Sequence, residues 1–372
     1  MYNISKFLKN LDNIFASESS SLLKPSILSW NITYSCNLRC SHCYASATLK
    51  RSDNELSQEE GLAFIESLQK YQGMVLVFSG GEPLVRSDDI FLFIEAASEF
   101  GLRPVIGTNG TLLKKYADKL KTAGLQKAGI SVDSPIADVH NSFRGVKKAF
   151  ERTLDGLKYC HKIGIGTQIH TTIGPNNIAD LERMADLATE LGCDAIHYFF
   201  MVPTGRASKL DLLSNQEHEN LLNKLYDIQK EASILIKPVC APQYLRVFSQ
   251  RLDEENGTTK SAFRRHGHFT RFKRGCLAGY SYARVDPFGD VTPCPYIDVV
   301  AGSVRDMSFP EIWENSHLIK KFQDGSLITG KCSVCDYLSN CGGGCRARAY
   351  SLSNKLDGVA PMCSYNSMSE GV

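Results

Sequence analysis

Apolar and amphipathic stretches alternate along the chain from Ile27 onward, about six times over the next 175 or so residues. Apolar runs of about four to eight residues rich in Val, Ile and aromatics predict strands, and the amphipathic stretches between them predict helices. The predicted strands are 27–34, 74–78, 103–107, 128–132, 166–173 and 194–201. The predicted helices begin near Ser57, Asp88, Leu112, Val146 and Asn177, and a capping box, Ser57-Gln58-Glu59-Glu60, supports the first of these starts.

Regular alternation of strand and helix indicates a parallel sheet covered by helices. Six such units are fewer than the eight of a closed barrel, so the pattern predicts an α/β fold with a partial, open (β/α)6 barrel. Active sites of such folds lie at the C-terminal ends of the strands. Functional residues are therefore expected in the loops that follow the strands.

The first of these loops carries three cysteines, Cys36, Cys40 and Cys43, spaced Cys-x3-Cys-x2-Cys. Three thiolates on so short a loop can bind three irons of a cubane cluster and leave the fourth iron open for a substrate or cofactor. A zinc ion with a distant fourth ligand is the alternative that this motif alone leaves open.

Unusual residues follow the other strands as well. After the second strand, Gly80 and Gly81 would let a ligand approach the backbone closely, and Glu82 offers an acceptor for an ammonium group. Each turn alone is commonly structural, but together they line one rim of the predicted barrel. The remaining candidates on this rim are Asn109, Ser131, Asp133, His140, Arg144 and Val202.

Composition and charge narrow the function classes. The chain has 372 residues, 43% of them apolar, which is enough for one large domain and a smaller one. A net charge of +2 gives no reason to expect nucleic acid or an anionic membrane as a partner. No run approaches the roughly eighteen apolar residues of a membrane span, and residues 1–7 lack a signal-peptide core. A cytoplasmic protein is expected.

Thirteen cysteines, mostly in close-spaced groups, fit metal or cluster ligation in a reducing compartment better than a disulfide framework. Cys160 and Cys193 stand apart and are predicted to be buried apolar thiols. Cys240 lies between two prolines in a predicted extended loop, where a structural and a ligating role both stay open. Seven more cysteines, too many for a zinc ribbon, occupy the C-terminal region: Cys276, Cys294, Cys332, Cys335, Cys341, Cys345 and Cys363.

Two segments separate the predicted barrel from this cysteine-rich region. A capping box at Ser214 predicts a helix to about residue 232 within a helical bridge, 206–262. Residues 263–274 interleave phenylalanines with arginines, lysine and two histidines, His266 and His268. Such a run is either a solvated face or a surface for a flat apolar ligand that bears carboxylates.

The pairing of Cys-x3-Cys-x2-Cys with Gly-Gly-Glu-Pro after the next strand resembles the radical SAM superfamily, over about residues 27–205. The seven C-terminal cysteines resemble its SPASM extension, over 263–372, which leaves 1–26 as an N-terminal extension. The resemblance implies that Cys36, Cys40 and Cys43 hold a 4Fe-4S cluster whose open iron chelates S-adenosylmethionine. The implied contacts to that cofactor are Gly80, Gly81, Glu82, Asn109, Ser131, Asp133, Arg144 and Val202. No catalytic residue is implied.

The SPASM resemblance also implies one or two auxiliary iron-sulfur clusters. One would be held by Cys332, Cys335, Cys341 and Cys363, and the other by Cys276, Cys294 and Cys345. Many members carry a further cysteine shortly before the position of Cys276, where this chain has Thr270 and its neighbours. The fourth ligand of the second cluster could therefore be Cys240, His266 or His268, or that iron could be open.

Several segments resemble the tetrapyrrole-modifying branch of the superfamily, especially the AdoMet-dependent heme synthases, and they include 238–243, 275–279 and 341–350. That likeness implies oxidative decarboxylation of two propionates of iron-coproporphyrin III to vinyl groups, giving heme b. The implied partners are an iron-containing tetrapyrrole and a one-electron donor such as ferredoxin or flavodoxin. Residues 4–8 and 29–33 resemble instead the d1-heme and deacetylating enzymes. The sequence also leaves open a peptide maturase and a non-catalytic iron-sulfur carrier.

Overall fold

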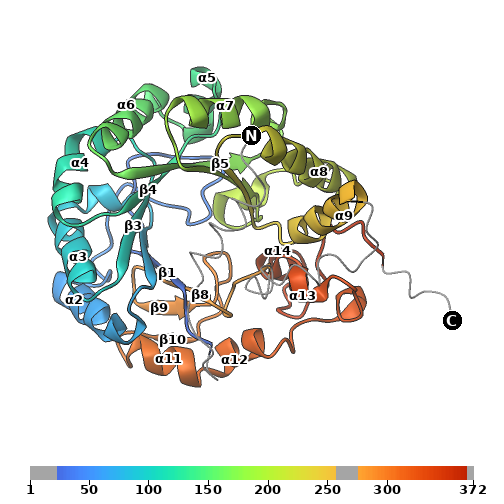
Figure 1. The fold of residues 1–372 in the computed structure, drawn as a ribbon. Coiled ribbons are helices and arrows are strands. Elements are labelled where there is room, and N and C mark those ends of the chain that lie inside the picture. Colours follow the sequence, from blue (N-terminus) through green and yellow to red (C-terminus); the bar gives the residue numbers. More distant parts are fainter. Residues whose placement is uncertain (1–22, 257–274, 367–372) are drawn as a thin grey trace.

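The computed structural model describes residues 23–256 and 275–366 of the chain (Figure 1). The basic and aromatic run at 263–274, with His266 and His268, lies outside the described residues, as does most of the predicted N-terminal extension.

A single sheet organises the fold, with strand order β10-β9-β8-β1-β2-β3-β4-β5-β6-β7. All pairings from β1 to β7 are parallel, so the C-terminal ends of these strands meet at one rim. The predicted strands are all present: β1 (Ile27–Asn31), β2 (Val75–Ser79), β3 (Arg103–Thr108), β4 (Lys127–Ser131), β5 (Gly166–Ile173) and β6 (Ala195–Phe200). The predicted fold class, a partial barrel followed by a cysteine-rich region, is confirmed.

A seventh parallel strand, β7 (Leu235–Val239), was expected to be part of an extended loop. It pairs with β6 and forms one edge of the sheet. Pro238 lies within it, and a proline is tolerated there because an edge strand has one side without a hydrogen-bonding neighbour. The apolar pattern did not predict this strand, because the run is short and contains a proline.

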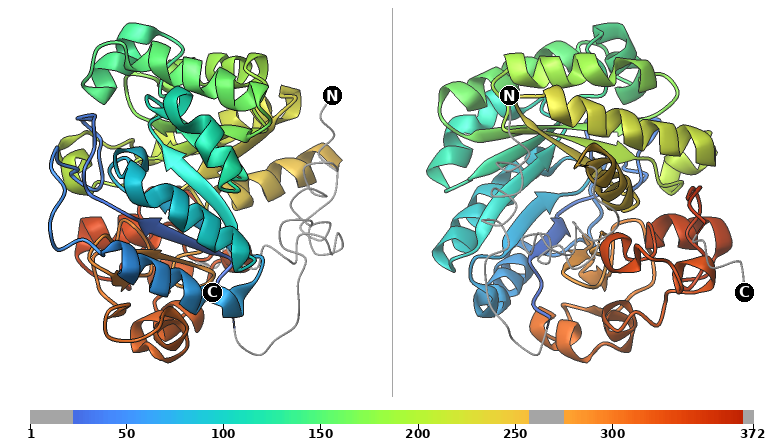
Figure 2. Two further views of the ribbon diagram at one scale, coloured as in Figure 1. Left: turned by 90° about the vertical axis from the view of Figure 1, so that its left-hand side faces the viewer. Right: turned by 45° about the vertical axis from the view of Figure 1, so that its right-hand side comes forward.

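The C-terminal region extends the same sheet at its other edge. Strand β8 (Tyr282–Val285) pairs in parallel with β1, and β9 (Asp290–Thr292) and β10 (Gly302–Ser303) follow antiparallel. Figures 1 and 2 show this region beside β1, closing the side of the open barrel that lies opposite β5. Its helices are α11 (Phe309–Asn315), α12 (His317–Gln323), α13 (Leu338–Cys341) and α14 (Arg346–Ser353).

Helices cover the outside of the barrel (Figure 1). They are α2 (Gln58–Ser67), α3 (Ser87–Glu99), α4 (Leu113–Thr122), α5 (Ala137–Arg144), α6 (Ala149–Lys162), α7 (Leu181–Glu190), α8 (Asn215–Glu231) and α9 (Tyr244–Asn256). The capping boxes predicted at Ser57 and Ser214 are both formed. Helix α5 was not predicted, and α9 lies within the predicted helical bridge, 206–262. In the two described stretches, no helix is long and apolar enough to cross a membrane.

Alternate strand residues face opposite sides of the sheet. Trp30 of β1 faces the helices, with its ring centroid 4.7 Å from that of Phe93 in α3. Tyr198 of β6 does the same, since its hydroxyl donates to the Leu181 carbonyl at the start of α7. Cys160 and Cys193 are buried in this layer, as predicted, and burial raises the pKa of each thiol to about 11. The strand residues that alternate with this outward set face the barrel interior.

Candidate active site

The first cysteine loop lies at the rim, directly after β1. Cys36 and Cys40 are buried and Cys43 is half-buried. Backbone amides point at two of the sulfurs, from Leu38 to Cys36 at 3.3 Å and from Ala47 to Cys43 at 3.4 Å. Burial raises the pKa of Cys36 to about 12 and also raises that of Cys40, so these sulfurs would lose their protons only to a strong Lewis acid such as iron. Buried thiols with amide donors fit cluster ligands.

Two glycines after β2 bring the next loop against the first. A Cβ on Gly80 would lie 2.3 Å from the carbonyl oxygen of Thr33, and one on Gly81 would lie 2.2 Å from that of Ser35. The Gly81 amide donates to the Thr33 carbonyl at 2.7 Å. The glycines were expected to admit a ligand; the structure shows that they admit the backbone of the neighbouring loop.

Glu82 is fully buried, and its carboxylate is already engaged. It accepts hydrogen bonds from the Leu84 amide at 3.1 Å, the Thr108 hydroxyl at 2.8 Å and the Asn109 amide at 2.8 Å. Burial raises its pKa to about 7, partly offset by these donors. The side chain therefore joins the loops after β2 and β3.

Asn109 links the loop after β3 to the cysteine loop. Its side-chain amide nitrogen donates to Asn37 Oδ1 at 2.8 Å and lies 4.0 Å from the Cys36 sulfur. Asn37 in turn donates to the Thr111 hydroxyl at 2.9 Å. The sequence did not identify Asn37 and Thr111 as site residues. An Asn inside a cysteine motif and a Thr after a turn are both common and do not by themselves indicate a functional role.

Asp133 and Arg144 form a buried ion pair beside the cysteine loop. The Arg144 Nε lies 2.6 Å from Asp133 Oδ2, and the side chains are 9% and 1% exposed for Arg144 and Asp133. Burial raises the pKa of Asp133, but the charge of Arg144 together with His42 and His140 outweighs it, and the net pKa is lowered. Arg144 Nη1 also donates to the Cys40 sulfur at 3.8 Å. Arg144 was predicted to bind a carboxylate of the cofactor; Asp133 already occupies one side of its guanidinium.

The loop after β6 holds the cysteine loop from the other side. Arg206 donates to the Cys40 carbonyl at 2.8 Å and to the Ala47 carbonyl at 2.9 Å. Val202 does not face this side: it is buried in the apolar cluster that contains Cys345. Ser131, half-buried at the end of β4, pairs in register with His170 and faces the barrel interior.

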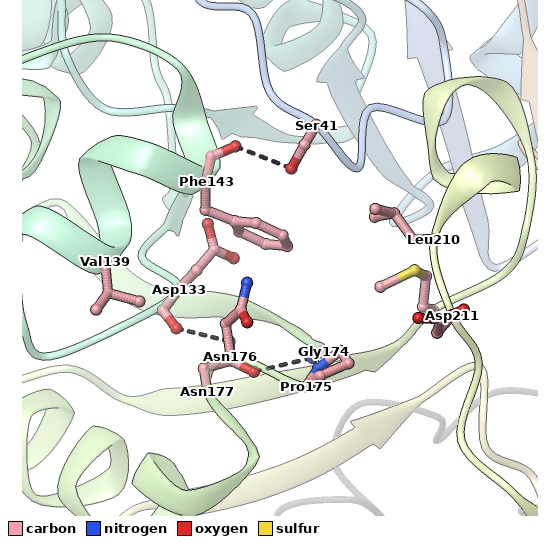
Figure 3. Close-up of a pocket in the computed structure, with 11 residues that line it drawn as sticks. Ser41, Asp133, Val139, Phe143, Gly174, Pro175, Asn176, Asn177, Leu210 and Asp211 are labelled. Carbon is pink, nitrogen blue, oxygen red and sulfur yellow. Dashed lines mark hydrogen bonds between the residues drawn. The ribbon is translucent and has the colours of Figure 1, made fainter.

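A cavity of about 250 Å³ opens beside the cysteine loop (Figure 3). Asp133, Asn177 and Phe143 line it, and Ser41 of the cysteine loop donates to the Phe143 carbonyl at 3.4 Å. Asn177 is held in place, since its amide nitrogen donates to the Asp133 carbonyl at 2.7 Å. His42 stacks on the Phe143 ring with centroids 3.9 Å apart. The cavity thus combines an aromatic wall with polar groups at the C-terminal ends of β4 and β5.

The C-terminal cysteines lie in two groups. In the outer group, the thiols of Cys332, Cys335 and Cys363 are close enough to raise the pKa of Cys341, although burial is the larger cause. The Gly344 amide donates to the Cys341 sulfur at 3.3 Å. These are the four cysteines predicted to share one cluster.

The inner group contains Cys276, Cys294 and Cys345, and the structure adds Cys240 to it. Cys240 follows β7 with a left-handed φ of 59°, and its thiol donates to the Cys345 sulfur. This hydrogen bond is the largest cause that lowers the pKa of Cys345 to about 6. Arg348 fixes the turn by donating to the Cys240 carbonyl at 3.0 Å. Cys240 was one of the fourth ligands that the sequence left open, and the structure places it beside Cys345.

Within residues 23–256 and 275–366, no three His, Cys, Asp or Glu side chains are arranged to coordinate one and the same metal ion. A zinc site needs all its ligands about 2.0–2.3 Å from one ion. The cysteines of an iron-sulfur cluster bind different irons and surround a larger volume. The donor sets, three buried thiols in one place and two groups of four in another, fit clusters.

Two family models match the chain. The model of the radical SAM superfamily matches residues 30–188, and that of the SPASM iron-sulfur cluster-binding domain matches residues 276–341. Both matches cover the cysteine motifs described above, apart from Cys240, Cys345 and Cys363.

Two curated relatives are similar over nearly the whole chain. The AdoMet-dependent heme synthase of Methanosarcina barkeri is 38% identical over 92% of this chain and 97% of its own length. The Fe-coproporphyrin III synthase of the same organism is 32% identical over 91% of this chain and 88% of its own length. Among solved structures, Streptococcus suis SuiB bound to S-adenosylmethionine has a TM-score of 0.71 at 17% identity, over 92% of this chain and 78% of that one. This last likeness shows the fold.

Proposed function

Because the chain belongs to the radical SAM superfamily and carries its SPASM extension, we propose that it is a heme-biosynthesis enzyme that acts on iron-coproporphyrin III. It would convert two propionate side chains into vinyl groups and give heme b. The observation that carries the proposal is the 38% identity to an AdoMet-dependent heme synthase over 97% of that protein's length. Each conversion removes one hydrogen atom, one carbon dioxide and one electron from the substrate.

The cofactors of a radical SAM enzyme with a SPASM domain are a 4Fe-4S cluster, S-adenosylmethionine and auxiliary iron-sulfur clusters. When bound, the first two supply the radical that takes hydrogen from the substrate. We assign Cys36, Cys40 and Cys43 to that cluster, because these thiols lie together on one loop beside an open rim and backbone amides point at two of their sulfurs. The cavity along Asp133 and Phe143 would hold the nucleoside, with its aromatic wall against the base.

The protein's own groups would orient the cofactor and exclude water. Backbone carbonyls at Gly80 and Gly81 would receive the amino group, since the Glu82 side chain is engaged elsewhere. The one guanidinium nitrogen of Arg144 that has no hydrogen bond among the described residues would reach a carboxylate. Asn109 and Ser131 complete the polar rim.

The auxiliary clusters would accept the electron that each decarboxylation leaves behind. Cys332, Cys335, Cys341 and Cys363 would hold the outer one. For the inner one we assign Cys240 as the fourth ligand beside Cys276, Cys294 and Cys345, because Cys240 already contacts the Cys345 sulfur. His266 and His268, the other candidates for this ligand, lie outside the described residues. A one-electron donor such as ferredoxin or flavodoxin would reduce the first cluster.

The test is anaerobic. The protein with reconstituted clusters is mixed with S-adenosylmethionine, reductant and iron-coproporphyrin III, and the porphyrin is followed by mass spectrometry beside 5′-deoxyadenosine. We expect two successive losses of a formic-acid equivalent, ending in heme b. Cys43→Ser should abolish both products, and Cys160→Ser, a buried cysteine outside the three cysteine groups, should retain them.

If 5′-deoxyadenosine forms while the porphyrin stays intact, the substrate assignment is wrong. Didecarboxysiroheme is then the next substrate, because the 32% identical relative is an Fe-coproporphyrin III synthase. Loss of acetyl groups from it would place the chain with that enzyme. A peptide substrate would be tested only if both tetrapyrroles remain unchanged.

A further inference from the structure

Three polar side chains form a row across neighbouring strands in the barrel interior: His170 on β5, His197 on β6 and Lys237 on β7. The strand register pairs His170 with His197, and His197 with Lys237. The two imidazole rings are stacked, with centroids 5.1 Å apart and planes 10° from parallel. His170 precedes the end of β5 at Ile173 by three residues, so the row lies roughly 10 Å below the rim.

The strand register and the burial of alternate residues show which side of the sheet these three side chains face. Tyr198, the neighbour of His197, donates to a carbonyl of the helical layer outside the barrel. His197 therefore faces the interior, and so do its two register partners. Gly129 on β4 makes room for the first ring, because a Cβ there would lie 2.3 Å from His170 Cε1. The space for the histidine is thus built into the adjacent strand.

Lys237 has no anionic partner in this interior. Among residues 23–256 and 275–366, no carboxylate forms an ion pair with it, and its ammonium group makes no hydrogen bond. Burial alone lowers its pKa. The charged and titratable groups that act on the histidines are Lys237, Lys127 and Arg144, all basic. A half-buried ammonium without a counter-ion is unfavourable, and a carboxylate of a ligand would relieve it.

The histidines offer neutral donors beside this cation. Burial lowers the pKa of His170 to about 4, so its ring is neutral at neutral pH. The Gln168 amide nitrogen lies 2.8 Å from His170 Nε2, which makes Nε2 an acceptor and leaves the ring proton on Nδ1. The Phe199 ring, one step closer to the rim on β6, lies 5.1 Å from that of His170. This part of the inner barrel wall thus combines an aromatic face with one cation and imidazole donors.

We propose that Lys237, His197 and His170 form a carboxylate-binding subsite that holds a propionate of the substrate inside the barrel. The identity of the ligand rests on the proposed function, whereas the chemistry needs only a carboxylate on an apolar body. The bound propionate is one that the reaction leaves intact. An ammonium ion that stabilises a carboxylate opposes its loss as carbon dioxide, so the cation would hinder a reacting side chain. The three residues act as positioning residues.

The first test measures the accessibility of Lys237 in the wild-type holoenzyme. Lysines are methylated anaerobically with formaldehyde and a borane reductant, and the extent of methylation of each lysine is measured by peptide mass spectrometry. Lys114, an exposed lysine of α4 that is paired with Asp155, is the internal control. The probes are iron-coproporphyrin III, its methyl ester and glutarate.

We expect the acid to slow methylation of Lys237 at least about tenfold, the ester to have no effect, and Lys114 to react equally throughout. If absorbance titration shows that the acid binds while Lys237 stays unprotected, the subsite is wrong and the proposed function stands. If the acid does not bind but glutarate protects Lys237, the subsite is right and the proposed substrate is wrong. Protection by none of the probes overturns the subsite.

The second test compares Lys237→Gln with Lys114→Gln in the holoenzyme. Loss of a charge-assisted hydrogen bond should raise the Kd for iron-coproporphyrin III by about 10- to 100-fold in the first variant and leave it unchanged in the second. The methyl ester should bind both variants alike. Equal affinity of Lys237→Gln and the wild type for the acid would overturn the proposal, whatever the product of the reaction proves to be.

Discussion

The Asp133–Arg144 ion pair provides a test of how the rim is held together. The Arg144 Nε lies 2.6 Å from the carboxylate, and both side chains are almost fully buried. Removing one member of such a pair leaves an uncompensated buried charge, which costs about 3–5 kcal/mol. We therefore expect Arg144→Met and Asp133→Asn each to lower the free energy of unfolding by about that amount.

The double variant carries neither charge. Its loss of stability should consequently fall short of the sum of the single losses by about 2–3 kcal/mol. The exposed pair Lys114–Asp155, 3.1 Å apart with side chains 64% and 57% exposed, is the matched control. The same cycle there, with Lys114→Met and Asp155→Asn, should give a coupling energy of no more than about 1 kcal/mol.

The assay is anaerobic urea unfolding followed by circular dichroism, on proteins with equal iron content. Iron content must be matched because Arg144 also donates to the Cys40 sulfur, so a variant that loses its cluster would report a second effect. A coupling energy at 133 and 144 as small as that of the exposed control would refute the reasoning. The burial of the pair would then have no energetic consequence.

Three further changes have outcomes that follow from single contacts. Cys240→Ser should lower the iron and sulfide content by up to one cluster and change the electron paramagnetic resonance spectrum. Cys193→Ser, which alters a buried thiol outside both cysteine groups, should change neither. Equal iron content in the two variants would show that Cys240 is not a cluster ligand. Burial lowers the pKa of His218 to about 3, so its folded state loses stability as the pH falls below about 6.5, by about 2 kcal/mol at pH 5. His218→Leu should remove that loss in urea unfolding at pH 7 and pH 5, while the exposed His317→Leu should keep it. Gly81→Ala places a methyl group 2.2 Å from the Ser35 carbonyl oxygen. It should therefore lower the melting temperature and abolish formation of 5′-deoxyadenosine. A melting curve like that of the wild type would contradict the close approach of Gly81 to Ser35.

Local patterns determined much of the fold and of the candidate site. Six strands, the capping boxes at Ser57 and Ser214 and the buried thiols Cys160 and Cys193 follow from apolar periodicity and from short-range hydrogen bonds, which neighbouring residues specify. The rim position of the first cysteines follows too, because parallel strands place all their C-terminal ends together.

Contacts between distant segments decided the rest. Strand β8 pairs with β1, and just before the two strands Ser26 donates to the Ser281 carbonyl, 255 residues away in sequence. No local pattern encodes such a pairing. No local pattern encodes the contact between Cys240 and Cys345 either. It depends on edge strand β7, which was not predicted because it contains Pro238.

Side-chain roles at the rim also needed the tertiary structure. A carboxylate such as Glu82 and a guanidinium such as Arg144 can serve a ligand or a neighbour equally well in sequence, and only packing shows that neighbours engage them first. The row of His170, His197 and Lys237 exists because register aligns three strands that lie far apart in the chain. Sequence specified which groups are present, and the long-range register of the sheet decided which of them meet.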